Sequence, residues 1–330
     1  MIKKATAVIP IQRAVIPNLI RDLTRRIAMS FSPKRRELFS KIEPWLYLSP
    51  FLIFIIIFTL YPVINVFTIS FKENYSYLRG TFKALNFENY KYVLTDDKFT
   101  SGLRNTALYV LFVVPVSTAI SLFFANLLNK KVKGSAIFQT AFFLPMVTSV
   151  TAVGLIWRLM YNQQYGIINW LLSKLGIEKI GWVTESRWSL LALIIFGTWN
   201  ILPFTIIILL SGMQNINETY YTVARVDGAK PMRIFFRITV PLLSPTIFLV
   251  CIVNTISCFK VFSELYPLFY GKPGPYYNLY TVVYYIRYAM MEKRKYGYAA
   301  AAAVILFLCI FVVTLLELYL KKRMGRKGLK

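Results

Sequence analysis

Uncharged apolar stretches alternate with charged segments along the 330-residue chain. Six stretches contain no Asp, Glu, Lys or Arg: residues 44–71, 105–129, 134–157, 188–217, 238–259 and 296–316. Each is long enough for a helix that crosses a hydrocarbon core of about 30 Å. Helices of soluble proteins average only about 11–12 residues, which argues against six buried core helices. The pattern predicts an all-α polytopic membrane protein with six transmembrane helices, at about 46–70, 105–129, 134–157, 189–216, 238–259 and 297–316.

The distribution of Lys and Arg orients these helices, because basic residues concentrate on the cytoplasmic side of a membrane. If the N-terminus is cytoplasmic, the inner segments hold 23 Lys and Arg in 82 residues, and the outer loops hold 16 in 104. We therefore expect both termini in the cytoplasm. The domains are then a basic tail at 1–44, a six-helix domain at 45–320 and a basic tail at 321–330.

Composition excludes several functions. The chain is 57% hydrophobic, has a net charge of +25 and contains no histidine. It therefore lacks His-ligated metal sites and Ser-His-Asp or Cys-His catalysis. We expect no catalytic residue, no metal site and no nucleic-acid partner.

The N-terminal tail carries an amphipathic pattern. Ile16, Leu19, Ile20, Leu23 and Ile27 recur at helical spacing, with arginines between them. This pattern predicts a helix that lies on anionic membrane lipid, the alternative being a solvated tail.

The inner loop at 218–241 is patterned as helix, turn and helix. Asn217 or Glu218 can cap a short first helix. Gly228 suits a helix end that needs a left-handed residue, and Asp227 can hold that turn through a side-chain hydrogen bond. Pro231 suits the first turn of a second helix. We expect a rigid projection on the cytoplasmic face, the alternative being an ordinary re-entrant loop.

The segment Thr222-Val-Ala-Arg-Val-Asp-Gly-Ala229, followed by Ile238 and Pro241, resembles the EAA loop of binding-protein-dependent ABC importer permeases. That family pattern is roughly Glu-Ala-Ala-x-x-Asp-Gly-Ala, then Ile-x-Leu-Pro. Thr222 stands where the pattern has Glu, and Val240 where it has Leu. Over residues 45–320, Phe142-Phe-Leu-Pro145, Gly166-Ile-Ile-Asn169 and Gly297-Tyr-Ala299 resemble the carbohydrate branch of the family, the maltose, lactose and glycerol-phosphate type.

The resemblance implies the type I ABC importer permease fold in a bacterial inner membrane. It implies as partners a second homologous permease subunit, two ATP-binding subunits and an extracytoplasmic solute-binding protein. The chain has no phosphate-binding loop of its own, so ATP and Mg would be bound by the partner subunits. The residues implied in coupling to the ATPase are Glu218, Tyr221, Thr222, Ala224, Arg225, Asp227, Gly228, Ala229 and Pro241.

Polar residues inside the spans should face either the solute pathway or another helix. The pathway candidates are Trp199, Asn200, Thr205, Asn254, Thr255 and Ser257. Lys260 and Glu264 are spaced i,i+4 near the outer end of the fifth span, which suits a salt bridge at an outer gate or a plain surface pair. The tyrosine-rich stretch at 276–288 predicts an interfacial helix.

The function expected is that of a permease subunit that forms half of the pathway for an oligosaccharide, a polysaccharide fragment or a sugar-phosphate-like solute. The absence of charge in the spans favours a neutral sugar. The alternative is a self-contained secondary transporter or channel, for which an internal repeat and mid-span carboxylates are typical. Neither feature is visible in the sequence.

Overall fold

The computed structural model describes residues 33–129, 140, 143 and 146–327. The predicted amphipathic helix around 16–27 and most of the Phe142–Pro145 motif lie outside these residues. The chain divides into two units, residues 1–65 and 66–330, and each is described by itself. Every regular element of the described residues is a helix.

The described part of the first unit is one long helix in three parts, charged in its first residues and apolar from Pro44 on. It comprises α2 (Pro33–Ile55), a π-helical turn η1 (Ile56–Leu60) and α3 (Tyr61–Ser70), whose last residues belong to the second unit. The π turn precedes Pro62, which has no N–H to donate and would crowd the carbonyl four residues earlier. The wider turn therefore relieves the proline without ending the helix.

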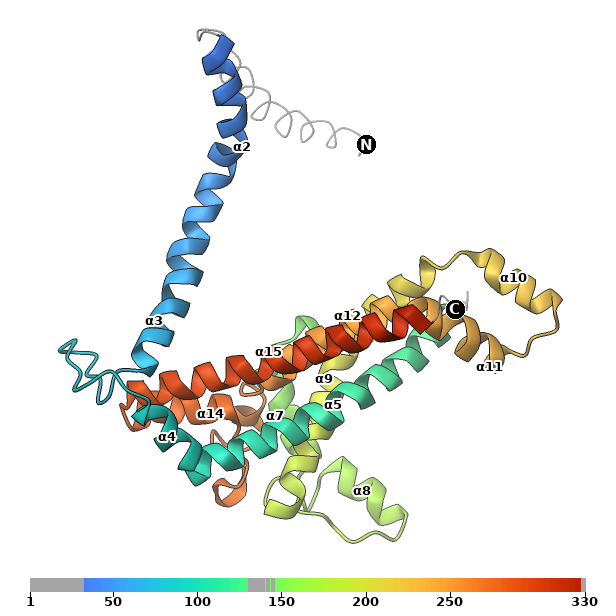
Figure 1. The fold of residues 1–330 in the computed structure, drawn as a ribbon. Coiled ribbons are helices and arrows are strands. Elements are labelled where there is room, and N and C mark those ends of the chain that lie inside the picture. The colour runs from blue at the N-terminus through green and yellow to red at the C-terminus, as the bar shows by residue number, and fades with distance from the viewer. Residues whose placement is uncertain (1–32, 130–139, 141–142, 144–145, 328–330) are drawn as a thin grey trace, which may run out of the picture. The chain divides into compact units, whose positions relative to one another are not determined.

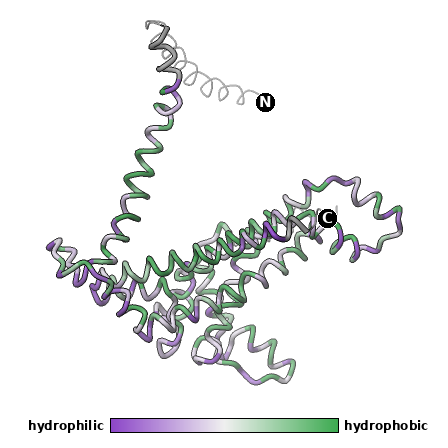
Figure 2. The backbone as a smooth tube through the Cα atoms, in the orientation of Figure 1, coloured by the Kyte–Doolittle hydropathy of each residue, from purple (hydrophilic) through white to green (hydrophobic). Residues whose placement is uncertain are grey.

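The second unit is built around four long apolar helices (Figure 1). They are α5 (Asp97–Asn129), α9 (Ser186–Gln214), α12 (Val240–Phe259) and α15 (Tyr296–Lys327). Helix α5 packs against α9 and α12, and α12 also contacts α9 and α15. Hydrophobic residues predominate along these helices, and hydrophilic residues are concentrated in the connections at their ends (Figure 2). The shorter elements are α4 (Glu88–Thr95), α7 (Val150–Met160), α8 (Ile167–Lys174), α10 (Glu218–Val226), α11 (Pro231–Ile234), η2 (Phe235–Thr239), α13 (Leu265–Leu268), η3 (Pro275–Tyr277), α14 (Val282–Arg287) and η4 (Tyr288–Glu292).

Five helices of the described residues are long and apolar enough to cross a membrane: Lys41–Ser70, Asp97–Asn129, Ser186–Gln214, Pro231–Phe259 and Tyr296–Arg323. The third predicted span, 134–157, is not one continuous helix. Ser149 has an extended backbone (φ −63°, ψ 130°), and the 11-residue α7 begins after it. Serine and threonine favour helix starts over helix interiors, so the Thr148-Ser149 pair is a natural point of interruption.

The tyrosine-rich segment does not form the expected surface helix. Tyr280, Tyr284 and Tyr285 are buried, and they belong to the same core as residues of α5 and α9. The Tyr285 hydroxyl donates to the Asp96 carboxylate at 2.9 Å. Buried tyrosine needs such a partner for its polar end, so this segment is anchored into the bundle.

Side chains of α5 satisfy the irregular backbone of that segment. Asn105 Nδ2 donates to the carbonyls of Asn278 and Tyr280, both at 2.9 Å. Thr106 Oγ1 accepts from the Val282 N–H at 3.1 Å. Backbone groups outside helices need such partners wherever water is excluded. The Asn-Thr pair at the predicted start of the second span therefore holds the loop that precedes α15.

Helices α5 and α9 approach closely at Gly197. A methyl group added at this glycine would overlap the hydroxyl of Tyr109, which is buried. A rigid ring on α5 therefore requires the smallest residue on α9.

We expect Gly197→Ala to destabilise the folded chain by about 1–3 kcal/mol, because overpacking forces the tyrosine or the helix to move. Thermal unfolding of the purified protein in detergent should show a lower midpoint. Gly197→Ala combined with Tyr109→Leu should recover part of the loss. Additive destabilisation in the double variant would contradict this packing account.

Candidate functional site

The 218–241 loop forms the helix, turn and helix that the sequence predicts. Asn217 caps α10, because its side-chain oxygen accepts from the Thr219 N–H at 2.9 Å. Pro231 occupies the first turn of α11. The loop projects from one end of the second unit, beside the C-terminal end of α15 (Figure 1).

A glycine turn closes α10. Gly228 has φ +71°. Its N–H donates to the Arg225 carbonyl at 3.1 Å, and the Ala229 N–H donates to the Ala224 carbonyl at 2.9 Å. This pair of bonds is the Schellman motif, which satisfies the last carbonyls of a helix. The predicted left-handed helix end at Gly228 is thus confirmed.

The side chain of Asp227 does not hold this turn. Within the described residues it makes no hydrogen bond, and its carboxylate is exposed. The Asp227 backbone N–H instead continues the helix by donating to the Val223 carbonyl at 3.0 Å. The prediction that the Asp227 side chain holds the turn is therefore wrong, because backbone hydrogen bonds from Gly228 and Ala229 already close it.

Two features join α10 to the span that follows. The Thr239 hydroxyl donates to the Tyr221 hydroxyl at 3.3 Å, and Thr239 is buried. The π turn η2 precedes Pro241 and leads directly into α12, as η1 precedes Pro62. The chain therefore runs as one helix from Pro231 to Phe259, with a side-chain tie back to α10.

One face of α10 is apolar and exposed. Tyr220, Val223 and Val226 are 55%, 54% and 83% exposed, and their spacing places them on neighbouring turns. Thr222 faces out as well, but its hydroxyl donates back to the Glu218 carbonyl at 3.2 Å. Among the expected coupling residues, Ala224 is buried and Tyr221 half-buried.

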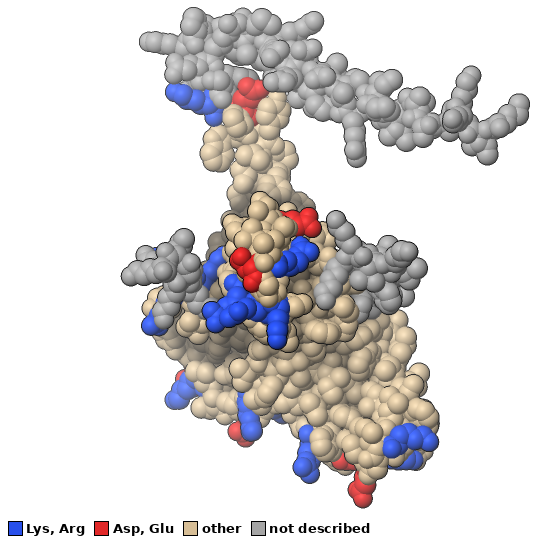
Figure 3. Space-filling view, turned by 90° about the vertical axis from the view of Figure 1, so that its right-hand side faces the viewer, with Lys and Arg blue, Asp and Glu red and all other residues tan. Residues whose placement is uncertain are grey.

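This apolar face is not among the features predicted from the sequence. Its signal is present in the sequence as large apolar residues at i, i+3 and i+6 within a loop expected to lie in water. Such a face on a rigid helix suits a protein partner. Lys and Arg, together with Asp and Glu, lie on this end of the second unit (Figure 3). Exposed basic residues of this region are Arg225, Lys230, Arg233 and Arg237.

Three of the six pathway candidates are engaged in contacts between helices of this chain. Asn254 Nδ2 donates to Thr205 Oγ1 at 3.0 Å, and both residues are buried. Thr255, also buried, donates to Glu317 Oε1 at 2.8 Å. These bonds join α12 to α9 and to α15.

The other three candidates remain partly or fully accessible. Trp199 is half-buried, and its ring lies 5.4 Å from the ring of Trp157. Asn200 is half-buried and Ser257 exposed, and neither makes a side-chain hydrogen bond with the described residues. They are therefore free to meet a solute or a second subunit.

Glu317 is a polar residue of α15 that is not among the candidates predicted from the sequence. Glu317 is the first residue after the last uncharged stretch, and it still lies within α15, which continues to Lys327. Its second carboxylate oxygen is buried without a hydrogen-bond partner in the described residues. Because α15 extends beyond the uncharged stretch that predicted the sixth span, Glu317 lies on the helix and contacts Thr255 of α12.

The predicted Lys260–Glu264 ion pair is not formed. Helix α12 ends at Phe259, so the two residues do not share a helix face. Glu264 instead accepts from the Phe262 N–H at 3.2 Å. The helical spacing that suggested the pair is lost where the helix stops.

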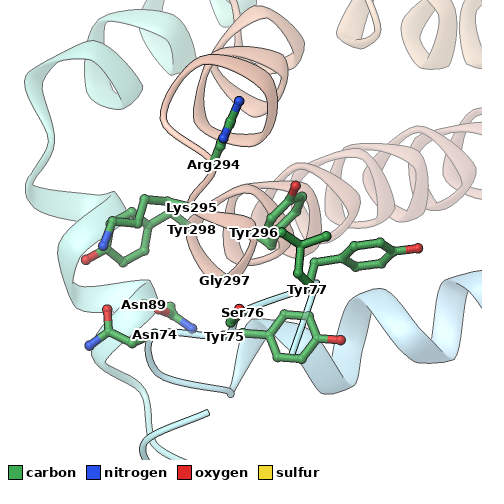
Figure 4. A pocket seen from close by; sticks show the side chains of 11 residues that line it. Asn74, Tyr75, Ser76, Tyr77, Asn89, Arg294, Lys295, Tyr296, Gly297 and Tyr298 are labelled. Atoms are coloured by element: carbon green, nitrogen blue, oxygen red, sulfur yellow. The ribbon is translucent and has the colours of Figure 1, made fainter. Parts of the chain in front are cut away.

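A cavity of about 320 Å³ lies at the end of the second unit opposite the 218–241 loop (Figure 4). It is lined by Asn74, Tyr75, Ser76, Tyr77, Leu78, Asn89, Arg294, Lys295, Tyr296, Gly297 and Tyr298. The rings of Tyr77 and Tyr296 are 5.5 Å apart. Beside the cavity, Lys83 and Asn86 donate hydrogen bonds to the Glu73 carboxylate at 2.9 and 2.7 Å, and these bonds lower the pKa of Glu73.

The sequence of this chain is similar to those of known transport proteins. Residues 117–326 match the family described as the binding-protein-dependent transport system inner membrane component. An arabinooligosaccharides transport system permease protein of Bacillus subtilis is 32% identical, over 89% of this chain and 93% of its own length. A lactose transport system permease protein of Rhizobium radiobacter is 30% identical, over 84% and 93%.

The fold is shared with a solved structure. A bacterial alginate ABC transporter in complex with alginate pentasaccharide-bound periplasmic protein matches with a TM-score of 0.72 and 23% identity. The match covers 87% of this chain and 98% of that one. The architecture described above is thus the ABC importer permease fold.

The family match covers well over half of the chain, and it includes the whole 218–241 loop. With its helical bundle and its projecting loop, the chain belongs to the family of inner-membrane components of binding-protein-dependent transport systems.

Proposed function

We propose that this chain is one of two permease subunits of an ATP-driven importer of oligosaccharides in a bacterial inner membrane. The observation that carries the proposal is the exposed apolar face of α10, formed by Tyr220, Val223 and Val226. This face lies on a short rigid helix outside the spans. It is the surface on which we place an ATP-binding subunit.

The charge distribution supports a cytoplasmic position for this surface. The end of the bundle with the 218–241 loop also carries Lys321, Lys322 and Arg323 on α15. Basic residues favour the cytoplasmic side, where ATP is available. The cavity of about 320 Å³ at the other end then faces the solute-binding protein.

The geometry suggests how motion reaches the membrane. A partner that moves α10 also moves α12, because Thr239 is bonded to Tyr221 and one helix runs from Pro231 to Phe259. Helix α12 is in turn bonded to α9 and α15. ATP-driven closure of the partners would therefore shift several spans together, as in rigid-body switching.

Oligosaccharide is the solute class we propose. Relatives at 30% and 32% identity are named for the transport of lactose and of arabinooligosaccharides. Trp199, Asn200 and Ser257 are the pathway candidates whose side chains remain accessible. An aromatic ring and uncharged polar groups suit a neutral sugar. ATP and Mg would be bound by the partner subunits, without a cofactor in this chain.

Replacing Val226 by Glu should prevent the ATP-binding subunits from binding. Val226 is 83% exposed and has little role in the fold, whereas a carboxylate in an apolar interface is strongly unfavourable. Copurification of the tagged permease with its ATPase should fall at least about tenfold.

Thr219→Glu is the matched control, because it places the same charge at an exposed position in the first turn of α10. It should leave copurification close to normal, since an acid is favourable near a helix N-terminus. Equal binding by the Val226 variant and the native chain would refute this docking surface.

Gly228→Val should abolish sugar uptake while leaving the chain inserted in the membrane. Valine is strained at φ +71°, so the turn that aims α10 must change, although the space around Gly228 is open. Uptake of labelled oligosaccharide and ATPase stimulation by the loaded binding protein should both be lost.

Gly176→Val imposes the same kind of strain elsewhere. Gly176 has φ +75° and open space around it, but it lies in the loop after α8. Transport should survive this substitution. Comparable transport loss in both variants would mean that general instability, not the direction of α10, explains the effect.

A further inference from the structure

A second cavity, of about 310 Å³, lies between α12 and α15. Ser244, Pro245 and Phe248 of α12 form one wall. Leu318, Lys321 and Lys322 of α15 form the other. The cavity sits at the end of the bundle from which the 218–241 loop projects, where the apolar part of α15 gives way to its basic end.

The two lysines of this cavity have no counter-charge within the described part of the chain. Neither makes an ion pair or a hydrogen bond there, and both are exposed. Glu317 precedes Lys321 by one helical turn, the spacing of a favourable ion pair. Its Oε1 accepts instead from the Thr255 hydroxyl at 2.8 Å. Two adjacent ammonium groups therefore remain beside an apolar cavity.

Exposed apolar residues neighbour the lining residues along both helices, on the side toward the middle of the spans. On α12, Leu249 follows Phe248 and is exposed. On α15, Val312 and Leu315 precede Leu318 and are exposed as well. The two lysines and the Ser244 hydroxyl lie at one end of an exposed apolar surface. A membrane phospholipid has the matching order, with a charged headgroup phosphate followed by acyl chains.

We propose that this cavity binds one acidic glycerophospholipid from the membrane leaflet on the side of the 218–241 loop. Lys321 and Lys322 hold the phosphate, the Ser244 hydroxyl donates to it, and the acyl chains lie along Phe248 and Leu318. Basic pockets between helices at this level of a membrane recognise anionic headgroups. The proposal goes beyond the transport function and does not depend on it.

Native mass spectrometry of the complete transporter, released from bilayers of phosphatidylglycerol and phosphatidylcholine, tests the site. The native chain should retain a phosphatidylglycerol molecule, and Lys321→Ala with Lys322→Ala should weaken that binding roughly 20-fold. The control Lys174→Ala with Lys272→Ala removes two exposed lysines elsewhere and should retain the lipid.

Photo-crosslinking from position 244 identifies the occupant directly. With a photoreactive residue in place of Ser244, the adduct should be phosphatidylglycerol, and its yield should fall in the Lys321 and Lys322 double variant. Equal lipid retention in both double variants would overturn the proposal. So would a crosslink to the second permease subunit, since a protein would then cover the cavity.

Discussion

Lipid offers no hydrogen bonds, and this constraint organises the structure. Polar groups inside a span are therefore stabilised by partners within the protein. Asn254 bonds to Thr205, and Thr255 bonds to Glu317, so that α12 is joined to α9 on one side and to α15 on another. The same requirement explains how Asn105 and Thr106 hold the irregular segment before α15. Polar residues that composition would assign to a solute pathway act here as contacts between helices.

The 218–241 loop leads into α12, which these hydrogen bonds join to α9 and α15. The loop is fixed at α10 by a capped start and a glycine turn, and Tyr221 joins it to Thr239 at the beginning of α12. A π turn lets the helix pass Pro241 without a break. Helix α10 is thus linked to α12 by the Gly228 turn, by the helix from Pro231 to Phe259 and by the Thr239–Tyr221 hydrogen bond.

Local features of this fold could be predicted from the sequence, and tertiary ones could not. Asn217, Gly228 and Pro231 act locally, Asn217 through a side-chain bond to the Thr219 N–H two residues on and the other two through their backbone geometry, so their residue types indicate such roles. The interruption at Ser149, the burial of Tyr285 and the bond between Thr255 and Glu317 depend on which helices meet. The separation of Lys260 from Glu264 follows from the end of α12 at Phe259, where the uncharged stretch 238–259 also ends, so the helical spacing of the two residues beyond that point had no helix to act in.

The central claim is that the apolar face of α10 contacts an ATP-binding subunit on the cytoplasmic side. The most direct measurement places a photo-crosslinking residue at Tyr220 in the assembled importer, with the exposed Tyr276 as the reference position. Irradiation should join position 220 to an ATP-binding subunit and position 276 to none. A crosslink from position 220 to the solute-binding protein, or to lipid alone, would contradict the account.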